Sequence, residues 1–391
     1  MSFLTLPAKF EIIIQNENSI KSQVHAALSN AERIYKANRV EFFPEYTDHG
    51  IEHVQKVLDT SVNIIDNVAL NLLTPNDVLM LVCSVLLHDI GLHLTQHGLF
   101  SLLNGDNDDF RNEFFDNKTW KEEWNHFYDE YLKFNERQID AIFGEQMQID
   151  QPNLASNNLN YYQRLYCGEF IRRHHGRLAH EIALKGICNI DKSYTNVLEI
   201  DKRDVNEIVG LIARSHTMNL RDLLEYLRKN YGSAWRVIYD SHVVFLMVVL
   251  RISDYIQISN DRADEIIIRT KIFSSPVSKK EFELNQSVNY VTDKTDDPEL
   301  LYVNAKPPDS RVFLKLEKLL TNIQLELDMS WAVLGEVYGS VKGLDKLRIR
   351  FRRIKSNIQD KDNFANKVNY IPNSFSFTAE PALLKFLISP L

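Results

Sequence analysis

The sequence predicts a mainly α-helical fold with a smaller α/β part towards the C-terminus, on three observations. The 391 residues include only 13 glycines and 11 prolines, about half the share of an average protein, so turns are scarce and long helices are favoured. Apolar residues recur at helical spacing through roughly the first 265 residues. Alternating segments typical of strands begin only after about residue 270.

Composition excludes several classes of protein. With 44% apolar and 25% charged residues, the chain is too apolar for intrinsic disorder. A net charge of −8 and a pI near 5.9 provide no global attraction to nucleic acid or to an anionic membrane. Three widely spaced cysteines give no disulfide framework and fit a reducing compartment. The longest apolar runs, 78–87 and 243–250, are too short to span a membrane. We therefore expect a cytoplasmic protein without a membrane partner.

We expect three parts in the chain: 1–44, 45–268 and 269–391. The first contains a packing helix over 18–38, which ends before Phe43-Pro44. A second helix should run from Asp48 to about residue 68.

The third helix has the clearest start and an unusual end. Thr74 is a predicted N-cap, Pro75 takes the first helical position, and Asp77 completes a capping box. The helix body is apolar on every face, which predicts a central position in the fold. It ends in His88-Asp89. Polar groups left unpaired at a buried helix end cost several kcal/mol. His88 and Asp89 therefore need a strong partner, either a salt-bridged network or a metal ion.

The rest of the chain alternates peripheral and core segments. Residues 100–160 are acidic, aromatic and rich in Asn, which is typical of an insertion that forms a lid or a partner surface. We expect further helices over 161–188, 202–216 and 234–260, and then strands at 288–291, 301–303 and 347–354 around a long helix over 309–340 that Asp309 caps.

The histidines point to one site in the first two thirds of the chain. Ten of the 12 lie between His49 and His216, and none follows His242. Imidazole and carboxylate suit Mn, Fe, Zn, Ni or Co, and a spread along the chain excludes a zinc finger. The candidates are His53, His88, Asp89 and Asp254, with four more histidines between them: His174, His175, His180 and His216.

The order of these residues resembles the HD-domain superfamily of metal-dependent phosphohydrolases. The matching segments are DHGIEHVQKVL, VCSVLLHDIG and VVLRISDYIQISNDRAD, within about residues 45–265. The resemblance implies an HD-type helical bundle in which His53, His88, Asp89 and Asp254 are metal ligands, with His49 an alternative to His53. It also implies one or two divalent ions, with Mg as a further candidate.

The resemblance further implies residues that act on the substrate. Histidines between the motifs would bind a second metal or the phosphate, which makes His93, His175 and His216 candidates for catalysis. The candidates for phosphate binding are His49, Arg172, Arg173 and Arg251. For each arginine, a solvated or salt-bridged role is equally open.

The expected function is hydrolysis of a phosphoester or phosphoanhydride, with a nucleotide such as a dNTP, cyclic nucleotide or alarmone as substrate. One alternative is a regulatory module that binds a nucleotide or a metal without turnover. Another is an HD-type nuclease, for which nucleic acid is the partner and the basic run from Lys346 to Arg352 a candidate surface. The closing region resembles the tail of bacterial HD domains that precede a GHKL-type ATPase domain, so an ATPase domain in a longer chain is an expected partner. Association of copies of the chain is also open.

Overall fold

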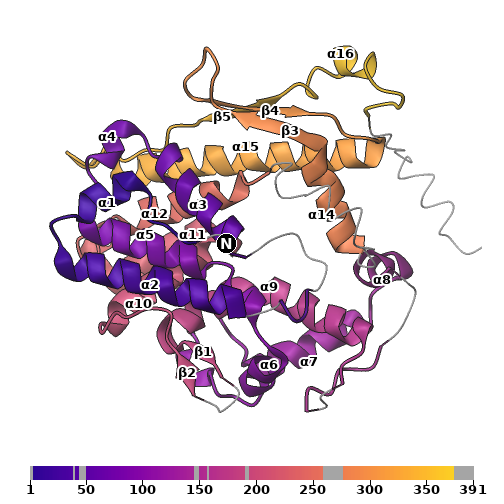
Figure 1. Ribbon diagram of the computed structural model, residues 1–391, viewed down its shortest axis with the longest axis horizontal. Coiled ribbons are helices and arrows are strands. Elements are labelled where there is room, and N and C mark those ends of the chain that lie inside the picture. The colour runs from indigo at the N-terminus through magenta and orange to yellow at the C-terminus, as the bar shows by residue number, and fades with distance from the viewer. Residues whose placement is uncertain are drawn as a thin grey trace, which may run out of the picture.

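The structure is a computed structural model that describes residues 3–37, 40–43, 50–144, 149–155, 158–189, 193–258 and 276–373. It is mainly helical, with one small sheet in the C-terminal part and a two-stranded ribbon elsewhere, which confirms the predicted fold class (Figure 1). The N-terminal part contains α1 (Ala8–Ile14), α2 (Asn18–Ala37), α3 (Ile51–Ile64), α4 (Asn67–Leu70) and α5 (Pro75–Leu87).

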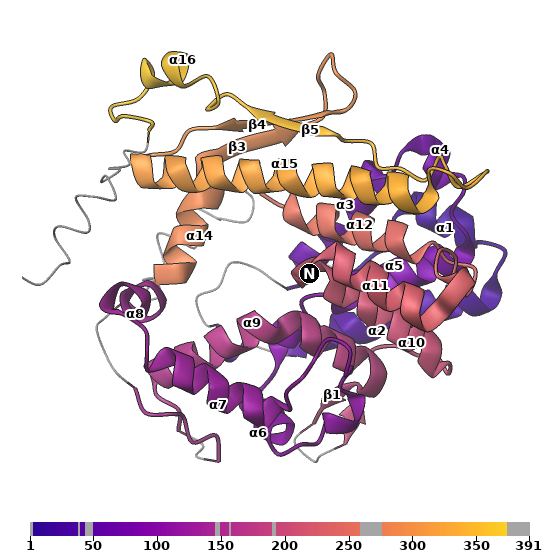
Figure 2. The same cartoon turned by 180° about the vertical axis from the view of Figure 1, so that it is seen from behind.

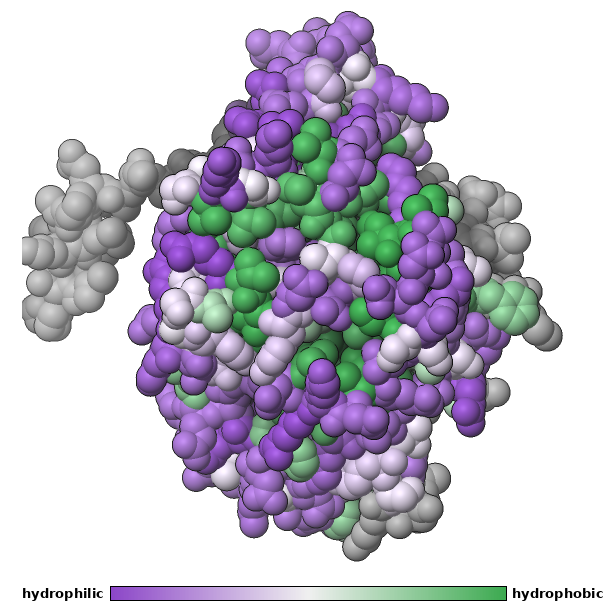
Figure 3. Space-filling view, turned by 90° about the vertical axis from the view of Figure 1, so that its left-hand side faces the viewer, coloured by the Kyte–Doolittle hydropathy of each residue, from purple (hydrophilic) through white to green (hydrophobic). Residues whose placement is uncertain are grey.

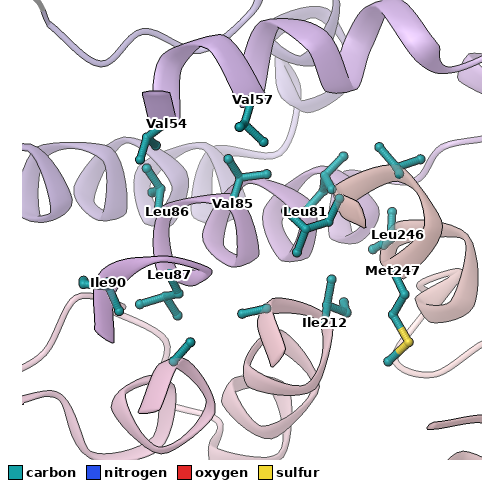
Figure 4. Packing of buried hydrophobic residues seen from close by; sticks show 14 of the residues in the cluster. Val54, Val57, Leu81, Val85, Leu86, Leu87, Ile90, Ile212, Leu246 and Met247 are labelled. Carbon is teal, nitrogen blue, oxygen red and sulfur yellow. The ribbon is translucent and has the colours of Figure 1, made fainter. Parts of the chain in front are cut away.

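Helix α5 is the centre of the core. Thr74 and Asp77 form the predicted capping box, and Pro75 is the first helical residue. Nearly every α5 side chain is buried because α2, α3, α10 and α12 pack around it. In Figure 4, Val54 and Val57 of α3 face Leu86 and Val85 of α5. The prediction of a central third helix is therefore confirmed.

The insertion forms a layer against the later helices. It contains α6 (Gln96–Leu103), the 3-10 turn η2 (Asp108–Phe110), α7 (Trp120–Tyr131) and α8 (Glu136–Phe143). Trp120 and Trp124 of α7 pack on Phe170 of α9 (Tyr161–Lys185), with ring centroids 6.1 and 4.9 Å apart. These aromatic residues are thus shared with the bundle and do not form a separate small core.

The remaining helices complete the bundle and lead into the C-terminal part. After α9 and the ribbon of β1 (Ile187–Cys188) and β2 (Tyr194–Thr195), the chain forms α10 (Arg203–Arg214), the 3-10 turn η3 (Ser215–Thr217), α11 (Leu220–Tyr231), the 3-10 turn η4 (Gly232–Ala234) and α12 (Val243–Tyr255). The predicted helix over 234–260 was wrong at its start. Tyr239 and Asp240 have positive φ of 51° and 56°, and this turn is closed by a bridge between Ile238 and Ser241.

The C-terminal part packs a three-stranded sheet along a long helix. Its elements are α14 (Pro276–Ser287), β3 (Val288–Thr292), β4 (Leu300–Ala305), α15 (Ser310–Tyr338), β5 (Arg353–Ser356) and α16 (Lys361–Ala365). β3 and β4 are antiparallel, whereas β4 and β5 are parallel. Figures 1 and 2 both show this sheet lying along α15. Asp309 caps α15 as predicted, accepting hydrogen bonds from the backbone of Arg311 and Val312.

The strand predicted over 347–354 was wrong for most of its length. Only its last two residues belong to β5, and Ile349 forms a single bridge with Ile65. The arginines of this segment pair with carboxylates. Arg350 lies 2.6 Å from Asp293, and Arg348 lies 3.5 Å from Asp66. These pairs weigh against a nucleic-acid surface here.

Apolar residues form a long helical stretch in the core and also gather on the surface. In the described part of the chain, one helical stretch, Pro75–His93, is long and apolar enough to cross a membrane, but 89% of it is buried, as in a core helix. Figure 3 shows apolar side chains gathered on the face that includes α1 and α4, with hydrophilic residues around them. On those helices Ile12 and Val68 are exposed.

Candidate metal centre

Three helices bring the first group of predicted ligands together. His53 lies in the first turn of α3, His88 and Asp89 follow the last turn of α5, and Asp254 lies in the last turn of α12. The Nε2 atom of His53 is 3.3 Å from Nε2 of His88, 3.4 Å from Oδ2 of Asp89 and 3.3 Å from Oδ1 of Asp254. We call these four residues the first donor group.

Asp89 also faces a second pair of histidines. Its Oδ1 atom is 3.5 Å from Nε2 of His175 on α9 and 3.8 Å from Nε2 of His216 on η3. The two imidazole nitrogens are 2.7 Å apart. Asp89, His175 and His216 form the second donor group, so the two oxygens of one carboxylate face different sets of donors.

The backbone sets the tautomer of three of these imidazoles. The Nδ1 atom of His88 is 2.7 Å from the carbonyl of Val85, three residues earlier. His175 and His216 repeat this contact with the carbonyls of Arg172 and Ala213. A carbonyl can only accept, so each Nδ1 donates and each Nε2 is left to bind a ligand. All three Nε2 atoms point to the centre.

The spacing of the donor atoms fits a divalent ion. Ligand atoms about 2.0–2.2 Å from a tetrahedral ion lie about 3.3–3.6 Å apart, and the Nε2 and carboxylate oxygens of the first donor group are separated by 3.3–3.7 Å. In the second group, the Nε2 atoms of His175 and His216 face each other at 2.7 Å, and both rings already donate through Nδ1. A proton or a metal ion bound by these two nitrogens would remove the repulsion between their lone pairs. Nitrogen and oxygen donors suit the metals expected above.

The charges of the centre shift the pKa values of its groups. Burial lowers the pKa of His88, but the carboxylates of Asp89 and Asp254 outweigh this effect and raise it to about 9. Burial also raises the pKa of Asp254, but its contacts with His53 and His88 hold that pKa well below its usual value. His216 behaves in the opposite way, because burial and the charges of His175 and His88 lower its pKa to about 3.

The centre opens to solvent on one side. The side chains of His53 and His88 are 1% and 0% exposed, whereas those of Asp254 and His175 are 24% and 16% exposed. A ligand from solvent therefore reaches the centre beside Asp254 and His175.

Two glycines let the backbones approach closely around His175. A Cβ on Gly91 would lie 3.0 Å from the carbonyl oxygen of His175, and one on Gly176 would lie 2.1 Å from Oγ1 of Thr217. A side chain at either position would force its neighbours to shift. The glycines thus allow α9 to lie directly against the turns that carry Asp89 and His216.

Other predicted residues lie beside the centre or cannot be placed. The ring of His93 packs edge-on against Tyr35 at 4.6 Å. Burial and the charge of Asp89 raise the pKa of Tyr35. His93, which packs on Tyr35, therefore lies close to the centre, but it belongs to neither donor group. His49 lies outside the described residues, and the structure places only His53 of the two alternatives.

The histidines that sequence alone could not sort have different environments. His174, although adjacent to His175, packs between Trp120 and Phe170, and burial together with nearby arginines lowers its pKa to about 4. His180 lies 3.0 Å from the carboxylate of Glu207. Only His175 and His216 of the four join the centre.

The arginines predicted to bind phosphate are all held by carboxylates. Arg172 and Arg173 both donate to Glu169, which lies three and four residues earlier on α9. Arg251 forms two bonds with Glu326 of α15, at 2.6 and 2.8 Å. Their role in phosphate binding stays a prediction, and the contacts favour the salt-bridged alternative.

A buried ionic network that the sequence did not reveal joins the insertion to α9 and α10. Asp116 accepts two bonds from Arg214, at 2.7 and 2.6 Å. Arg177 donates to Glu181, which also accepts from the indole of Trp120 at 2.7 Å. Acids and arginines are common in this chain, so no spacing marked these pairs in advance. Gly176 did signal close packing at this point of α9, because a glycine inside a helix costs about 1 kcal/mol relative to alanine.

These features define a mainly helical protein whose buried histidines and aspartates could hold a divalent metal between helix ends. A family model described as HD-CE matches residues 43–329, most of the chain. The chain belongs to this HD-type family. No curated protein and no solved structure matches it.

Proposed function

We propose that the protein is a metal-dependent phosphohydrolase that cleaves a phosphoester or phosphoanhydride, with a nucleotide as substrate. The observation that carries the proposal is the position of Asp89, whose two oxygens face two separate groups of imidazole donors. Such a carboxylate suits a bridge between two ions. The family membership supports the same class of site.

The residues have separate tasks in this proposal. His53, His88 and Asp254 would hold one ion, and His175 and His216 a second, with Asp89 between them. A divalent ion held there would lower the pKa of a bound water towards about 7 and would polarise a phosphoryl oxygen. The carbonyls of Val85 and Ala213 keep the imidazoles oriented by accepting their Nδ1 protons. The phosphate would enter beside the partly exposed Asp254 and His175, where the side chains leave access to solvent.

The test is formation of hydrolysis products (phosphate, pyrophosphate, triphosphate, nucleoside, nucleotide or oligonucleotide) from a panel of dNTPs, cyclic nucleotides, alarmones and single-stranded DNA or RNA, each with Mn²⁺, Mg²⁺, Co²⁺ or Ni²⁺. We expect His88→Ala and Asp254→Ala to lose bound metal and hydrolysis together. His126→Ala is the matched control, because His126 is an exposed histidine of α7 beside Glu130. Metal content and hydrolysis that survive in both variants would refute the proposal, and cleavage of nucleic acid alone would favour the nuclease alternative.

A regulatory module that binds a metal or nucleotide without turnover is the second candidate. It is favoured by the engagement of Arg172, Arg173 and Arg251 with carboxylates, which leaves fewer cations for a transferring phosphoryl group. Binding of a nucleotide by the metal-loaded protein, with no product formed from any member of the panel, would select this function. An ATPase domain in a longer chain would then be its target.

A further inference from the structure

The turn that carries His216 is held from two sides by arginines. η3 spans only Ser215–Thr217, and His216 is its middle residue. Such a short turn has little hydrogen bonding of its own, so its neighbours decide where the imidazole lies. Arg214 leads into it from α10, and Arg251 reaches it from α12.

Arg251 connects the turn to the C-terminal part of the chain. Its Nη1 atom donates to the backbone carbonyls of Ser215 and Met218, which lie on either side of His216. Its Nε and Nη2 atoms bind both carboxylate oxygens of Glu326 on α15. One edge of the guanidinium therefore contacts η3 and the other contacts α15. A lysine could not make both sets of contacts, because it lacks the planar fork of donors.

Arg214 connects the same turn to the insertion. Its guanidinium forms a two-bond pair with Asp116, and both side chains are more than nine-tenths buried, at 8% and 7% exposure. The carbonyl of Arg214 accepts a hydrogen bond from Thr217 Oγ1 at 3.1 Å, which closes η3. Arg214 thus ties the backbone of the turn to a carboxylate about one hundred residues earlier in the chain.

We propose that Arg214 and Arg251 are positioning residues for His216, and that Asp116 and Glu326 couple the second donor group to the insertion and to α15. The inference deepens the proposed function, on which it rests for the second ion. The carboxylates keep two partly buried guanidinium groups in place, and the guanidinium groups hold the turn so that His216 stays 2.7 Å from His175. Arg251 is then a support of the metal centre and not a phosphate ligand.

The first donor group provides the contrast. His53 and His88 come from α3 and α5, whose facing apolar side chains fix them in the core (Figure 4). Asp116 and Glu326 instead hold Arg214 of α10 and Arg251 of α12, the two arginines that fix η3. Loss of either carboxylate should therefore weaken the second donor group selectively.

The experiment compares the wild type with Asp116→Asn, Glu326→Gln and a matched control, Glu336→Gln. Glu336 lies on the same helix as Glu326 and, like it, accepts two hydrogen bonds from arginine. Its partners are Arg221 and Arg228, which both belong to α11. Metal content is measured after equilibration with Mn²⁺, and hydrogen exchange of the peptide over 211–220 is measured in metal-free protein. We expect Asp116→Asn and Glu326→Gln to retain one ion per chain, to lose the second, and to exchange several-fold faster over this peptide. Glu336→Gln should match the wild type in both measurements.

The two readouts separate the inference from the proposed function. Unchanged exchange over 211–220 in both carboxylate variants would overturn the inference, as would an equal effect of Glu336→Gln. Loss of both ions in the variants would also overturn it, because a selective support cannot act on the first donor group. A wild type that binds no second ion, with selective exchange effects intact, would refute the two-ion function and leave the positioning role supported.

Discussion

Replacing Gly176 by alanine tests whether close backbone approach sets the distance between His175 and His216. The added Cβ would lie 2.1 Å from Oγ1, 3.0 Å from Cγ2 and 3.1 Å from Cβ of Thr217. Rotating Thr217 would leave the contact with its Cβ and would break the hydrogen bond from its Oγ1 to the carbonyl of Arg214, so we expect η3 to shift away from α9. Overpacking of this kind costs about 1–3 kcal/mol. Alanine regains about 1 kcal/mol of helix propensity, so we expect a net loss of up to about 2 kcal/mol.

The assay measures metal content together with the midpoint of thermal unfolding. Gly176→Ala should lower the midpoint and remove the second ion, because His216 moves with η3. Gly335→Ala on α15 is the control, since nothing lies within 4 Å of its added Cβ and the change should stabilise the helix. A double variant with Thr217→Ala should recover most of the loss, because only the contact at 3.1 Å then remains. Wild-type metal content and stability in Gly176→Ala alone would refute this reasoning.

Four further predictions concern protonation and the environment of the centre. The pKa of His88 is raised to about 9 in the metal-free protein, so an ion must displace its proton. The apparent affinity for Mn²⁺ should therefore rise about tenfold per pH unit between pH 7 and 9. An affinity that does not change with pH would contradict this. The same raised pKa means that the stabilisation from protonated His88 is complete below about pH 6.5 and is lost as pH rises through 9, so unfolding midpoints of metal-free protein should fall over that range, more than in His88→Ala. His174→Phe should keep the wild-type metal content, and its free energy of unfolding should change by less than about 1.5 kcal/mol. His175→Phe should lose the second ion, as measured by elemental analysis. Trp120→Phe removes a hydrogen bond to buried Glu181 and should cost about 1–3 kcal/mol in denaturant titrations, an effect that unchanged midpoints would exclude.

The helices with strong local signals could be predicted from the sequence. Thr74, Pro75 and Asp77 define the start of α5 by capping chemistry, which depends only on neighbouring residues. The start of α12 could not be found in this way, because Tyr239 and Asp240 both have positive φ and only the aspartate is a residue type that favours a turn. The strand over 347–354 failed for a related reason: Leu347, Ile349 and Phe351 alternate and are buried, but their backbone lies beside Ile64 and Asp66 of another element instead of a long partner strand.

The candidate site was predictable as a set of residue types, but not as a geometry. His53, His88, Asp89 and Asp254 come together as the sequence order indicated. The sequence could not separate His175 from His174, since adjacent helical residues point about 100° apart and either face could have met the centre. Asp116 and Glu326 could not be found, because their importance comes from arginines that are distant in the chain.

The residues of the candidate centre come from distant parts of the chain, and this bears on the order of folding. His53 and Asp254 stand at opposite ends of the bundle's sequence, and His175 and His216 lie between them. Contacts between such distant segments form only after large loops have closed, which makes them late events on a folding pathway. A nascent chain that has not yet reached α12 lacks the last carboxylate of the first donor group. Uptake of an ion by the first donor group would then require synthesis past α12 and folding of the bundle around it, whereas the second donor group needs only the chain up to η3.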